Sequence, residues 1–262
     1  MASSGGFIAV GRLPAMDLTG RNIAITGASS GIGEATARAC ADAGAAVALG
    51  ARRLDRIEAL AREIEEGGGR AVALETDVGD ERQARAFVEH AYEQLGGLDG
   101  LVNNAGVMLL GPVAGAPTDE WRRMIDVNVL GVLYCTHAAL PVLLQGEGPR
   151  DIVTISSVAG RVAGAGSAVY NLTKFGVGAF SEGLRQEVTA QGIRVTLVEP
   201  GAVTTELQSH NRPEIQAIIE KRFADMEPLT ADDIARAVVY ALSQPRHVSV
   251  NEVLVRPTDQ VR

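Results

Sequence analysis

From Arg21 almost to the C-terminus, short apolar runs alternate with longer segments in which apolar residues recur at helical spacing. Short apolar runs are typical of buried strands, and apolar residues at positions i, i+3 and i+4 indicate amphipathic helices. Parallel strands need a long crossover, and a helix between two strands provides one that is almost always right-handed. The alternation therefore predicts an α/β fold, a doubly wound parallel sheet with helices on both faces.

The same alternation sets the expected bounds of the elements. Strands are expected at residues 22–26, 46–51, 71–75, 100–102, 151–155, 194–198 and 252–255. Helices are expected at residues 31–43, 53–66, 81–95, 119–144, 168–190 and 231–243, with a pair of helices around residues 213–226. Because no linker, repeat or low-complexity run divides the pattern, we expect a single domain over residues 17–262 and an N-terminal extension at residues 1–16.

Composition and charge exclude several classes of function. The chain has 24 Lys and Arg against 32 Asp and Glu, a net charge of −8, so nothing attracts it generally to nucleic-acid phosphates. No stretch approaches the roughly 18 uninterrupted apolar residues of a membrane span. The two cysteines, Cys40 and Cys135, form no CxxC pair and lack metal-ligand spacing, which predicts a reduced, cytoplasmic protein without a metal site.

The first expected strand runs directly into a glycine-rich turn at residues 26–33, after which a helix begins. Glycines let the backbone approach a ligand closely, and the free N–H groups at a helix start bind phosphate. The candidate residues for a dinucleotide pyrophosphate are Gly27, Ser29, Ser30, Gly31, Ile32 and Gly33. The turn also matches the Gly-x-Ser-x-Gly nucleophile elbow of hydrolases, with His247 later in the chain, but only one strand precedes Ser29, so we favour the dinucleotide.

Two arginines follow the second expected strand, where the adenosine ribose of a dinucleotide would lie. An acid there accepts a hydrogen bond from the 2′-hydroxyl, whereas an arginine pairs with the 2′-phosphate of NADP. Residues 50–52 contain no acid, and Arg52 and Arg53 stand at a helix start, where a cation opposes the helix dipole. They could be solvated residues, but we favour phosphate contacts, which predict NADP(H) as the cofactor.

The next two strand ends carry polar residues. The carboxylate that follows the third strand either accepts from an adenine amino group or caps the helix that begins near Asp80. The turn at residues 103–106 fixes loop backbone and would contact the cofactor mostly through its own backbone. The candidate cofactor residues at these two ends are Asp77, Val78, Asn104, Ala105 and Gly106.

A serine, a tyrosine and a lysine form the most informative group. Ser157 follows the fifth strand, and Tyr170 and Lys174 share one helix face at positions i and i+4. A nearby cation favours phenolate and lowers a tyrosine pKa that is ordinarily about 10. Tyr170 could then act as a general acid or base near neutral pH.

Together these motifs resemble the short-chain dehydrogenase/reductase family over residues 18–255. The matching positions are the turn at 26–33, Asp77, the turn at 103–106, Asn128, Ser157 thirteen residues before Tyr170, Lys174, Pro200-Gly201 and Thr205. The resemblance implies a Rossmann-like sheet of order 3-2-1-4-5-6-7, a nicotinamide cofactor across the carboxyl ends of the strands, and a homotetramer.

The resemblance also implies catalytic roles. Tyr170 would donate a proton to a carbonyl or accept one from an alcohol, and Ser157 would fix the substrate oxygen beside it. Lys174 would bind the nicotinamide ribose and lower the pKa of Tyr170. Asn128 would hold a water that relays protons, although it could instead satisfy a helix bulge.

Further positions would hold the cofactor. After Pro200 and Gly201, the backbone of Val203 and the side chain of Thr205 would hold the nicotinamide carboxamide, although Thr205 could simply cap the next segment. NADP users of the family often carry a basic residue where this chain has Ser30, which leaves Arg52 to determine the NADP preference.

We therefore expect an NADP(H)-dependent oxidoreductase that interconverts a carbonyl and an alcohol on a small to medium substrate. The alternative is a catalytically silent NADP-binding regulatory or assembly protein. The ending at residues 248–258 resembles the subgroup of 3-hydroxy acid, serine and clavulanate-type dehydrogenases, which suggests a hydroxy acid or an aldehyde. The expected pocket residues are Val107, Met108, Leu109, Val158, Val162, Ala163 and Ala202, a lid at 206–226, and His210, Asn211 and Arg212 at a polar substrate end or in solvent.

Overall fold

A computed structural model describes residues 16–223 and 226–261, so residues 1–15 of the expected extension lie outside the described residues. Seven parallel strands form one sheet in the order β3-β2-β1-β4-β5-β6-β7, which confirms the order expected from the resemblance. The strands are β1 Asn22–Thr26, β2 Ala46–Ala51, β3 Arg70–Glu75, β4 Gly100–Asn103, β5 Arg150–Ile155, β6 Ile193–Pro200 and β7 Glu252–Val255.

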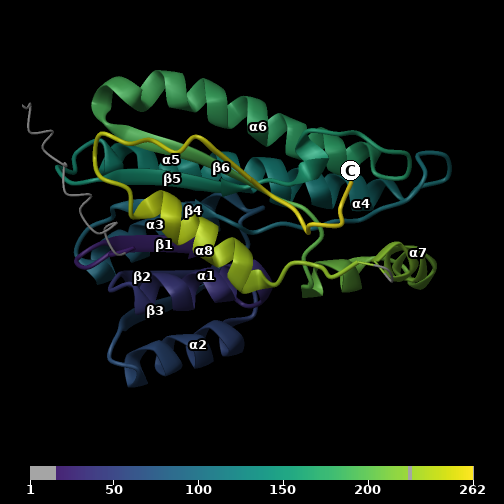
Figure 1. Ribbon diagram of the computed structural model, residues 1–262. Coiled ribbons are helices and arrows are strands. Elements are labelled where there is room, and N and C mark those ends of the chain that lie inside the picture. The colour runs from purple at the N-terminus through teal and green to yellow at the C-terminus, as the bar shows by residue number, and fades with distance from the viewer. Residues whose placement is uncertain (1–15, 224–225, 262) are drawn as a thin grey trace, which may run out of the picture.

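Helices cover both faces of the sheet (Figure 1). The α-helices are α1 Gly31–Asp42, α2 Leu54–Glu66, α3 Glu81–Leu95, α4 Thr118–Ile125, α5 Gly131–Leu143, α6 Ala168–Val188, α7 Pro213–Phe223 and α8 Ala231–Leu242. Shorter turns are the π-helix η1 Asp126–Leu130 and the 3-10 helices η2 Val158–Gly160, η3 Thr189–Gln191 and η4 Glu206–His210. Helices α1, α2 and α8 pack on one face, and α3, α5 and α6 pack on the other.

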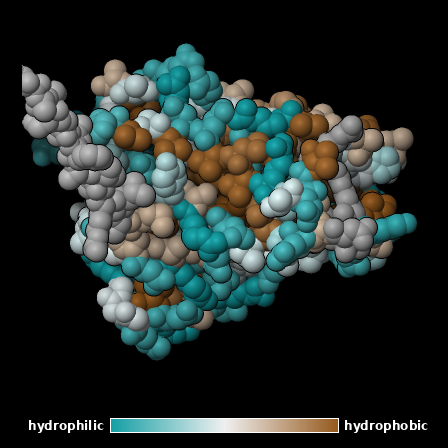
Figure 2. Space-filling view, viewed as in Figure 1, coloured by the Kyte–Doolittle hydropathy of each residue, from teal (hydrophilic) through white to brown (hydrophobic). Residues whose placement is uncertain are grey.

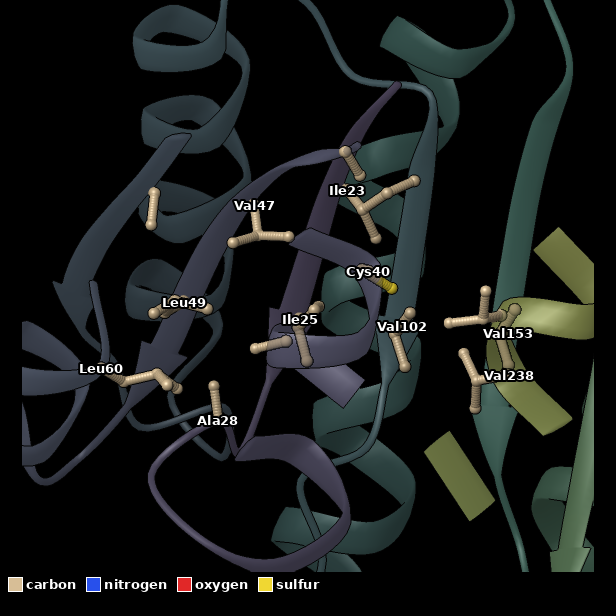
Figure 3. Packing of buried hydrophobic residues seen from close by; sticks show 14 of the residues in the cluster. Ile23, Ile25, Ala28, Cys40, Val47, Leu49, Leu60, Val102, Val153 and Val238 are labelled. Carbon is tan, nitrogen blue, oxygen red and sulfur yellow. The ribbon is translucent and has the colours of Figure 1, made fainter. Parts of the chain in front are cut away.

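Strand side chains alternate between the two faces and so build two cores. On β1, Ile23 and Ile25 lie on the face that Cys40 of α1 covers (Figure 3), in the same core as Val238 of α8, whereas Ala24 belongs to the opposite core. Because successive side chains of a strand point to opposite faces, a nearly continuous apolar run is what a strand buried on both faces needs.

Three expected elements differ from the structure. The expected helix at 119–144 is broken by the π-helix η1, whose extra residue per turn carries Asn128 inward. The expected strand at 194–198 continues to Pro200, because Pro200 still pairs with Val255 of β7. In place of the pair of helices expected around 213–226 the structure shows the single helix α7, and residues 224–225 lie outside the described part.

The composite helix Thr118–Leu143 has a mean hydropathy of 1.4 over its most apolar window, so by length and composition alone it is apolar enough to cross a membrane. In the fold, Cys135, Ala139 and Leu143 of this helix pack in the core beside α3. The expected absence of a membrane partner stays a prediction.

Strand β7 forms an outer edge of the sheet. Figure 2 shows apolar side chains gathered between α6 and α8, where the C-terminal segment runs beside β6. Leu254 of β7 and Tyr240 of α8 are exposed. An exposed strand edge can pair with another chain, so the expected homotetramer stays a prediction with this edge as one place for a subunit contact.

Candidate active site

A cavity of about 390 Å³ lies at the carboxyl ends of the strands. The predicted site residues that line it are Gly27, Ser29, Ser30, Gly31, Ile32, Arg52, Arg53, Asp77, Val78, Asn104, Ala105, Gly106, Ser157, Tyr170, Lys174, Pro200, Gly201, Val203 and Thr205. Gly33 and Asn128 do not line it, and each supports a neighbour that does. The structure therefore brings the cofactor turn and the Ser–Tyr–Lys group into one cavity.

The glycine-rich turn has the shape that a pyrophosphate needs. Gly27 and Gly31 adopt φ values of 67° and 56°, and a Cβ at Gly33 would lie 2.3 Å from the Gly27 carbonyl oxygen. Ser30 is the N-cap of α1 but makes no capping hydrogen bond through its side chain, so it leaves the first N–H groups of the helix available. Free N–H groups at a helix N-terminus bind phosphate, so these residues fit the dinucleotide that the motif predicts.

The turn at residues 103–106 holds the glycine-rich turn in place. Asn104 donates from Nδ2 to the carbonyl oxygens of Thr26 and Gly27, at 2.9 and 3.2 Å. In return, the Thr26 hydroxyl accepts from the backbone N–H groups of Asn104 and Ala105. This turn thus closes the loops on each other while Ala105 and Gly106 face the cavity.

The structure shows that Asp77 does not cap the following helix. Asp80, not Asp77, caps α3 by accepting from the N–H groups of Arg82 and Gln83. Asp77 instead accepts from the Gly79 N–H at 3.0 Å and lines the cavity. The adenine contact of Asp77 stays a prediction.

Arg53 lies against the glycine-rich turn, which contains no basic residue of its own. Its Nε and Nη2 donate to the Ser29 hydroxyl at 3.1 and 2.9 Å, and Nη2 also donates to the Ser30 hydroxyl at 2.7 Å. The Ser29 hydroxyl is therefore engaged with an arginine, and His210 is the histidine that lines this cavity, not His247. These contacts weigh against the hydrolase alternative, in which Ser29 would need a base.

Tyr170 and Lys174 begin the long helix α6 and are both buried. Lys174 donates from Nζ to the Ile155 carbonyl oxygen at 2.9 Å, and its Nζ lies 5.8 Å from the centre of the Tyr170 ring. Ser157 caps η2, where its hydroxyl accepts from the Ala159 N–H at 3.1 Å. The segment after β5 and the first two turns of α6 thus place a hydroxyl, a phenol and an amine in one wall.

The expected lowering of the Tyr170 pKa by Lys174 is wrong for this structure. Burial raises the pKa of Tyr170 to about 12, and only the hydrogen bond with Ser157 acts in the opposite direction. Burial also lowers the pKa of Lys174 to about 8, so near pH 8 a large fraction of this amine is neutral. The phenol therefore stays protonated near neutral pH.

The lowered pKa of Lys174 predicts how stability changes with pH. Unfolding returns its pKa to about 10.5, so between pH 8 and 10.5 the unfolded chain binds more protons and the contribution of this group to stability rises with pH. Relative to Lys174→Met, we expect the parent to gain roughly 1 kcal/mol per pH unit across this window. Urea unfolding of both proteins at pH 7 to 10 measures the difference, and parallel curves would contradict it.

Asn128 reaches from η1 to the backbone of Val107. Its Oδ1 accepts from the Val107 N–H and its Nδ2 donates to the Val107 carbonyl oxygen, both at 2.8 Å, while Nδ2 also approaches the Thr173 hydroxyl at 3.2 Å. Asn128 therefore positions the strand-end segment that lines the cavity. The alternative reading of Asn128 is confirmed, because it lies in the π-helix η1, a bulge within the longer helix. Its role of holding a water for proton relay stays a prediction.

The substrate end of the cavity is only partly as expected. Val107, Met108 and Ala202 line it, whereas Leu109, Val158, Val162 and Ala163 do not. Leu109 packs instead into a separate apolar cluster with Met124. The carboxyl ends of strands bring the first residues of a loop to the cavity, and the loop residues beyond them turn away.

Of the three polar lid residues only His210 lines the cavity. Asn211 is buried, and its Oδ1 accepts from the Leu110 N–H at 2.7 Å. Arg212 lies 3.7 Å from carboxylate oxygens of both Glu120 and Glu214. Asn211 and Arg212 therefore fasten the lid and do not face a substrate.

The ion pairs of Glu206 were missed by sequence reasoning. Glu206 follows Thr205, lines the cavity and pairs with Arg53 and Arg56. Thr205 also caps η4 by accepting from the Leu207 N–H at 3.3 Å, as the alternative reading of this residue expected. The sequence offers no signal for these pairs, since partners about 150 residues apart meet only through the fold.

Comparison with known proteins agrees with this geometry. The sequence profile of a family described as short chain dehydrogenase matches residues 21–216. An uncharacterized oxidoreductase of Staphylococcus saprophyticus is 42% identical over 242 residues, which cover 91% of this chain and 96% of the relative. Glycine betaine reductase of Emericella nidulans is 42% identical over 250 residues, which cover 95% of this chain but only 19% of that protein.

Solved structures of the same architecture carry nicotinamide dinucleotides. The closed form of serine dehydrogenase with NADP+ matches with a TM-score of 0.85 and 31% identity, covering 92% of this chain and 96% of that one. An alcohol dehydrogenase of Thermococcus sibiricus with 5-hydroxy-NADP matches with a TM-score of 0.82 and 31% identity, covering 92% and 98%. A short chain dehydrogenase/reductase of Burkholderia phymatum with NAD matches with a TM-score of 0.81 and 25% identity, covering 91% and 89%. Since the family profile spans well over half of its length, this oxidoreductase chain belongs to the short-chain dehydrogenase family.

Proposed function

We propose that this protein is an NADP(H)-dependent oxidoreductase that interconverts a carbonyl and an alcohol, with Tyr170 as general acid and base. The observation that carries the proposal is that Ser157, Tyr170 and Lys174 line the same cavity as the uncapped start of α1. A bound nicotinamide would supply or accept the hydride. The chain itself would orient the substrate and manage its proton.

Each of the three side chains has a distinct part in that chemistry. Carbonyl reduction builds negative charge on the substrate oxygen, and hydroxyl donors aimed at that oxygen stabilise the transition state more than the ground state. Ser157 and Tyr170, which line the cavity and are hydrogen-bonded to each other, would supply those donors. Tyr170 stays protonated near neutral pH because burial raises its pKa to about 12, which suits proton donation during reduction. The Lys174 amine donates to the Ile155 carbonyl oxygen, and this hydrogen bond holds the amine beside the Tyr170 ring.

We propose that Arg52 gives the protein its preference for NADP(H). Arg52 lines the cavity at the end of β2 and is exposed, and within residues 16–223 and 226–261 it makes no hydrogen bond or salt bridge. Its five N–H donors are thus available to a 2′-phosphate. The related structures carry NADP or NAD, so the preference has to be measured on this protein.

Replacement of Arg52 tests that preference. We expect the parent to bind NADPH at least about tenfold more tightly than NADH, because a charge-assisted pair contributes about 1.5–3 kcal/mol. Arg52→Gln should bring the ratio of the two dissociation constants near one by weakening NADPH alone, as measured by fluorescence titration. Arg62→Gln, an exposed arginine farther along α2, is the matched control. A parent that prefers NADH would overturn the assignment.

The substrate is proposed to be small or medium in size and mainly apolar near the reacting carbon. Val107, Met108 and Leu207 are aliphatic walls, and Glu206, Gln208 and His210 are polar lid residues that line the same cavity. Burial first, and then Arg123, Arg52 and Arg53, lower the pKa of His210, so it is mostly neutral at pH 7 and suits a hydrogen bond more than an ion pair. The names glycine betaine reductase and serine dehydrogenase suggest short aldehydes and hydroxy acids for a first panel.

The function is tested by following NADPH consumption with carbonyl compounds and NADP+ reduction with the matching alcohols. Turnover that requires Tyr170 supports the oxidoreductase. Tight NADPH binding without turnover on any member of the panel would favour the alternative, a silent NADP-binding regulatory or assembly protein.

A further inference from the structure

Three charged side chains join the two sides of the cavity, and we call them the clasp: Arg53, Arg56 and Glu206. Glu206 opens η4, and its two carboxylate oxygens accept from Nη1 of Arg53 at 2.7 Å and Nη1 of Arg56 at 2.8 Å. The two arginines stand at the start of α2: Arg53 is its N-cap, and Arg56 lies in its first turn. One carboxylate therefore connects the loop after β6 to the loop after β2.

Arg53 extends the clasp to a third loop. Its Nε and Nη2 contact the hydroxyls of Ser29 and Ser30 in the glycine-rich turn, while Nη1 contacts Glu206. Arg53 thus uses both edges of its planar fork within the protein, whereas Arg52 beside it is left to meet a ligand. Arg53 therefore binds groups of the protein, and Arg52 remains available to a ligand.

The residue that begins η4, its N-cap Thr205, packs against the turn that would bind the pyrophosphate. A Cβ at Gly31 would come within 3.2 Å of the Cβ of Thr205, the residue before Glu206. A dinucleotide seated on the turn would therefore lie next to the segment that the clasp holds, and we expect that segment to move when the dinucleotide leaves.

We infer that Glu206 is a positioning residue that holds η4 closed over the bound cofactor through the clasp, and so slows cofactor release. This inference rests on the proposed dinucleotide site and adds a residue to it. The clasp acts on the protein and not on the 2′-phosphate, so it retards NADPH and NADH alike. In this respect it differs from Arg52, which discriminates between them.

The clasp is charged over the whole working range of pH. Its two arginines, Arg56 first, lower the pKa of the Glu206 carboxyl to about 2. All three side chains are about half-exposed, so the pairs contribute little to global stability and Glu206→Gln should fold normally. Exposure also makes the clasp sensitive to salt.

The test is stopped-flow release of NADPH and of NADH from the parent and from Glu206→Gln. We expect release of both cofactors to become about three- to tenfold faster, the size expected for two partly exposed ion pairs. Added salt should speed NADH release from the parent more than from the variant, because only the parent has the clasp to screen. Arg56→Gln, whose side chain does not line the cavity, should give part of the effect, and the double variant should be no faster than Glu206→Gln.

Glu182→Gln is the matched control. Glu182 is half-exposed on α6, its carboxyl pKa is likewise lowered to about 2, by Arg185 and Gln186, and it does not line the cavity. Its release rates should equal those of the parent. Unchanged release from Glu206→Gln would overturn the clasp, and so would slower release of NADPH alone, which would show that Glu206 competes with the 2′-phosphate for Arg53. Failure of the parent to bind either cofactor would instead overturn the proposed function, and the clasp with it.

Discussion

Tyr170→Phe should lower turnover at least about a hundredfold while leaving the dissociation constant of NADPH within roughly twofold, the usual pattern for loss of a positioned acid. The phenol is buried and protonated near neutral pH because burial raises its pKa to about 12. Phenylalanine keeps the ring that packs with Val107, Leu109 and Met124, so the fold and the cavity wall stay in place. The measurement is turnover at saturating NADPH, on the best substrate of the panel, beside a fluorescence titration of the cofactor.

Tyr240→Phe is the control for that experiment, because it removes a phenolic hydroxyl from the exposed face of α8, away from the cavity. It should behave as the parent does. Turnover of Tyr170→Phe within threefold of the parent would refute the assignment of Tyr170 as the acid. A large fall in turnover together with a large loss of NADPH affinity would point to a cavity that no longer forms.

The fold could be predicted almost completely from the sequence. Both faces of the sheet are covered by helices, so its strands are nearly continuous apolar runs that stand out in the sequence. Ile23, Ala24 and Ile25 read as one apolar run, and the structure sends them to two different cores. Periodicity alone does not reveal the break in the helix at η1, although an asparagine within a long helix raised a bulge at Asn128 as an alternative. It depends on a hydrogen-bonded fit between Asn128 and the Val107 backbone, which lies 21 residues away.

The site was predictable where a motif lies at a strand end and unpredictable where loops meet. The turn at 26–33 and the Ser157–Tyr170–Lys174 group lie next to strands of known order, so topology alone brings them together. The lid was different. Asn211, expected at a polar substrate end or in solvent, instead accepts a hydrogen bond from the Leu110 backbone N–H.

The electrostatics were the hardest part to anticipate. Helical spacing placed Lys174 beside Tyr170, but spacing does not report how deeply a pair is buried. Desolvation raises the pKa of the phenol and lowers the pKa of the amine. It therefore outweighs the lowering of the tyrosine pKa by a nearby cation that the spacing predicts. The same limit applies to Glu206, whose partners come from a loop that the sequence does not connect to it.

A buried charged group at the opposite end of the sheet supports the fold on which the site depends. Asp151 of β5 is almost fully buried and accepts from Arg21 at 2.7 Å and from Arg194 of β6 at 2.7 and 2.8 Å. Both arginines also donate to the carbonyl oxygen of Leu242, at the end of α8. One carboxylate therefore fastens β5 and β6, the residue before β1, and a helix on one face.

Asp151→Ala should lower the free energy of unfolding by about 3–5 kcal/mol, because it leaves two buried guanidinium groups without their counter-charge. For a chain of this size that corresponds to a fall of roughly 10 °C in Tm. Asp151→Asn keeps a hydrogen-bond acceptor and should cost less. The control is Glu63→Gln, which breaks the exposed pair with Arg38 and should cost no more than about 1 kcal/mol. Asp151 lies near the start of β5 and the reacting groups near its end, so the folded fraction of Asp151→Ala should keep the parent's turnover in the cold. Equal losses of stability in Asp151→Ala and Glu63→Gln would mean that the two arginines can find other partners, and that the buried carboxylate does not hold the strands together.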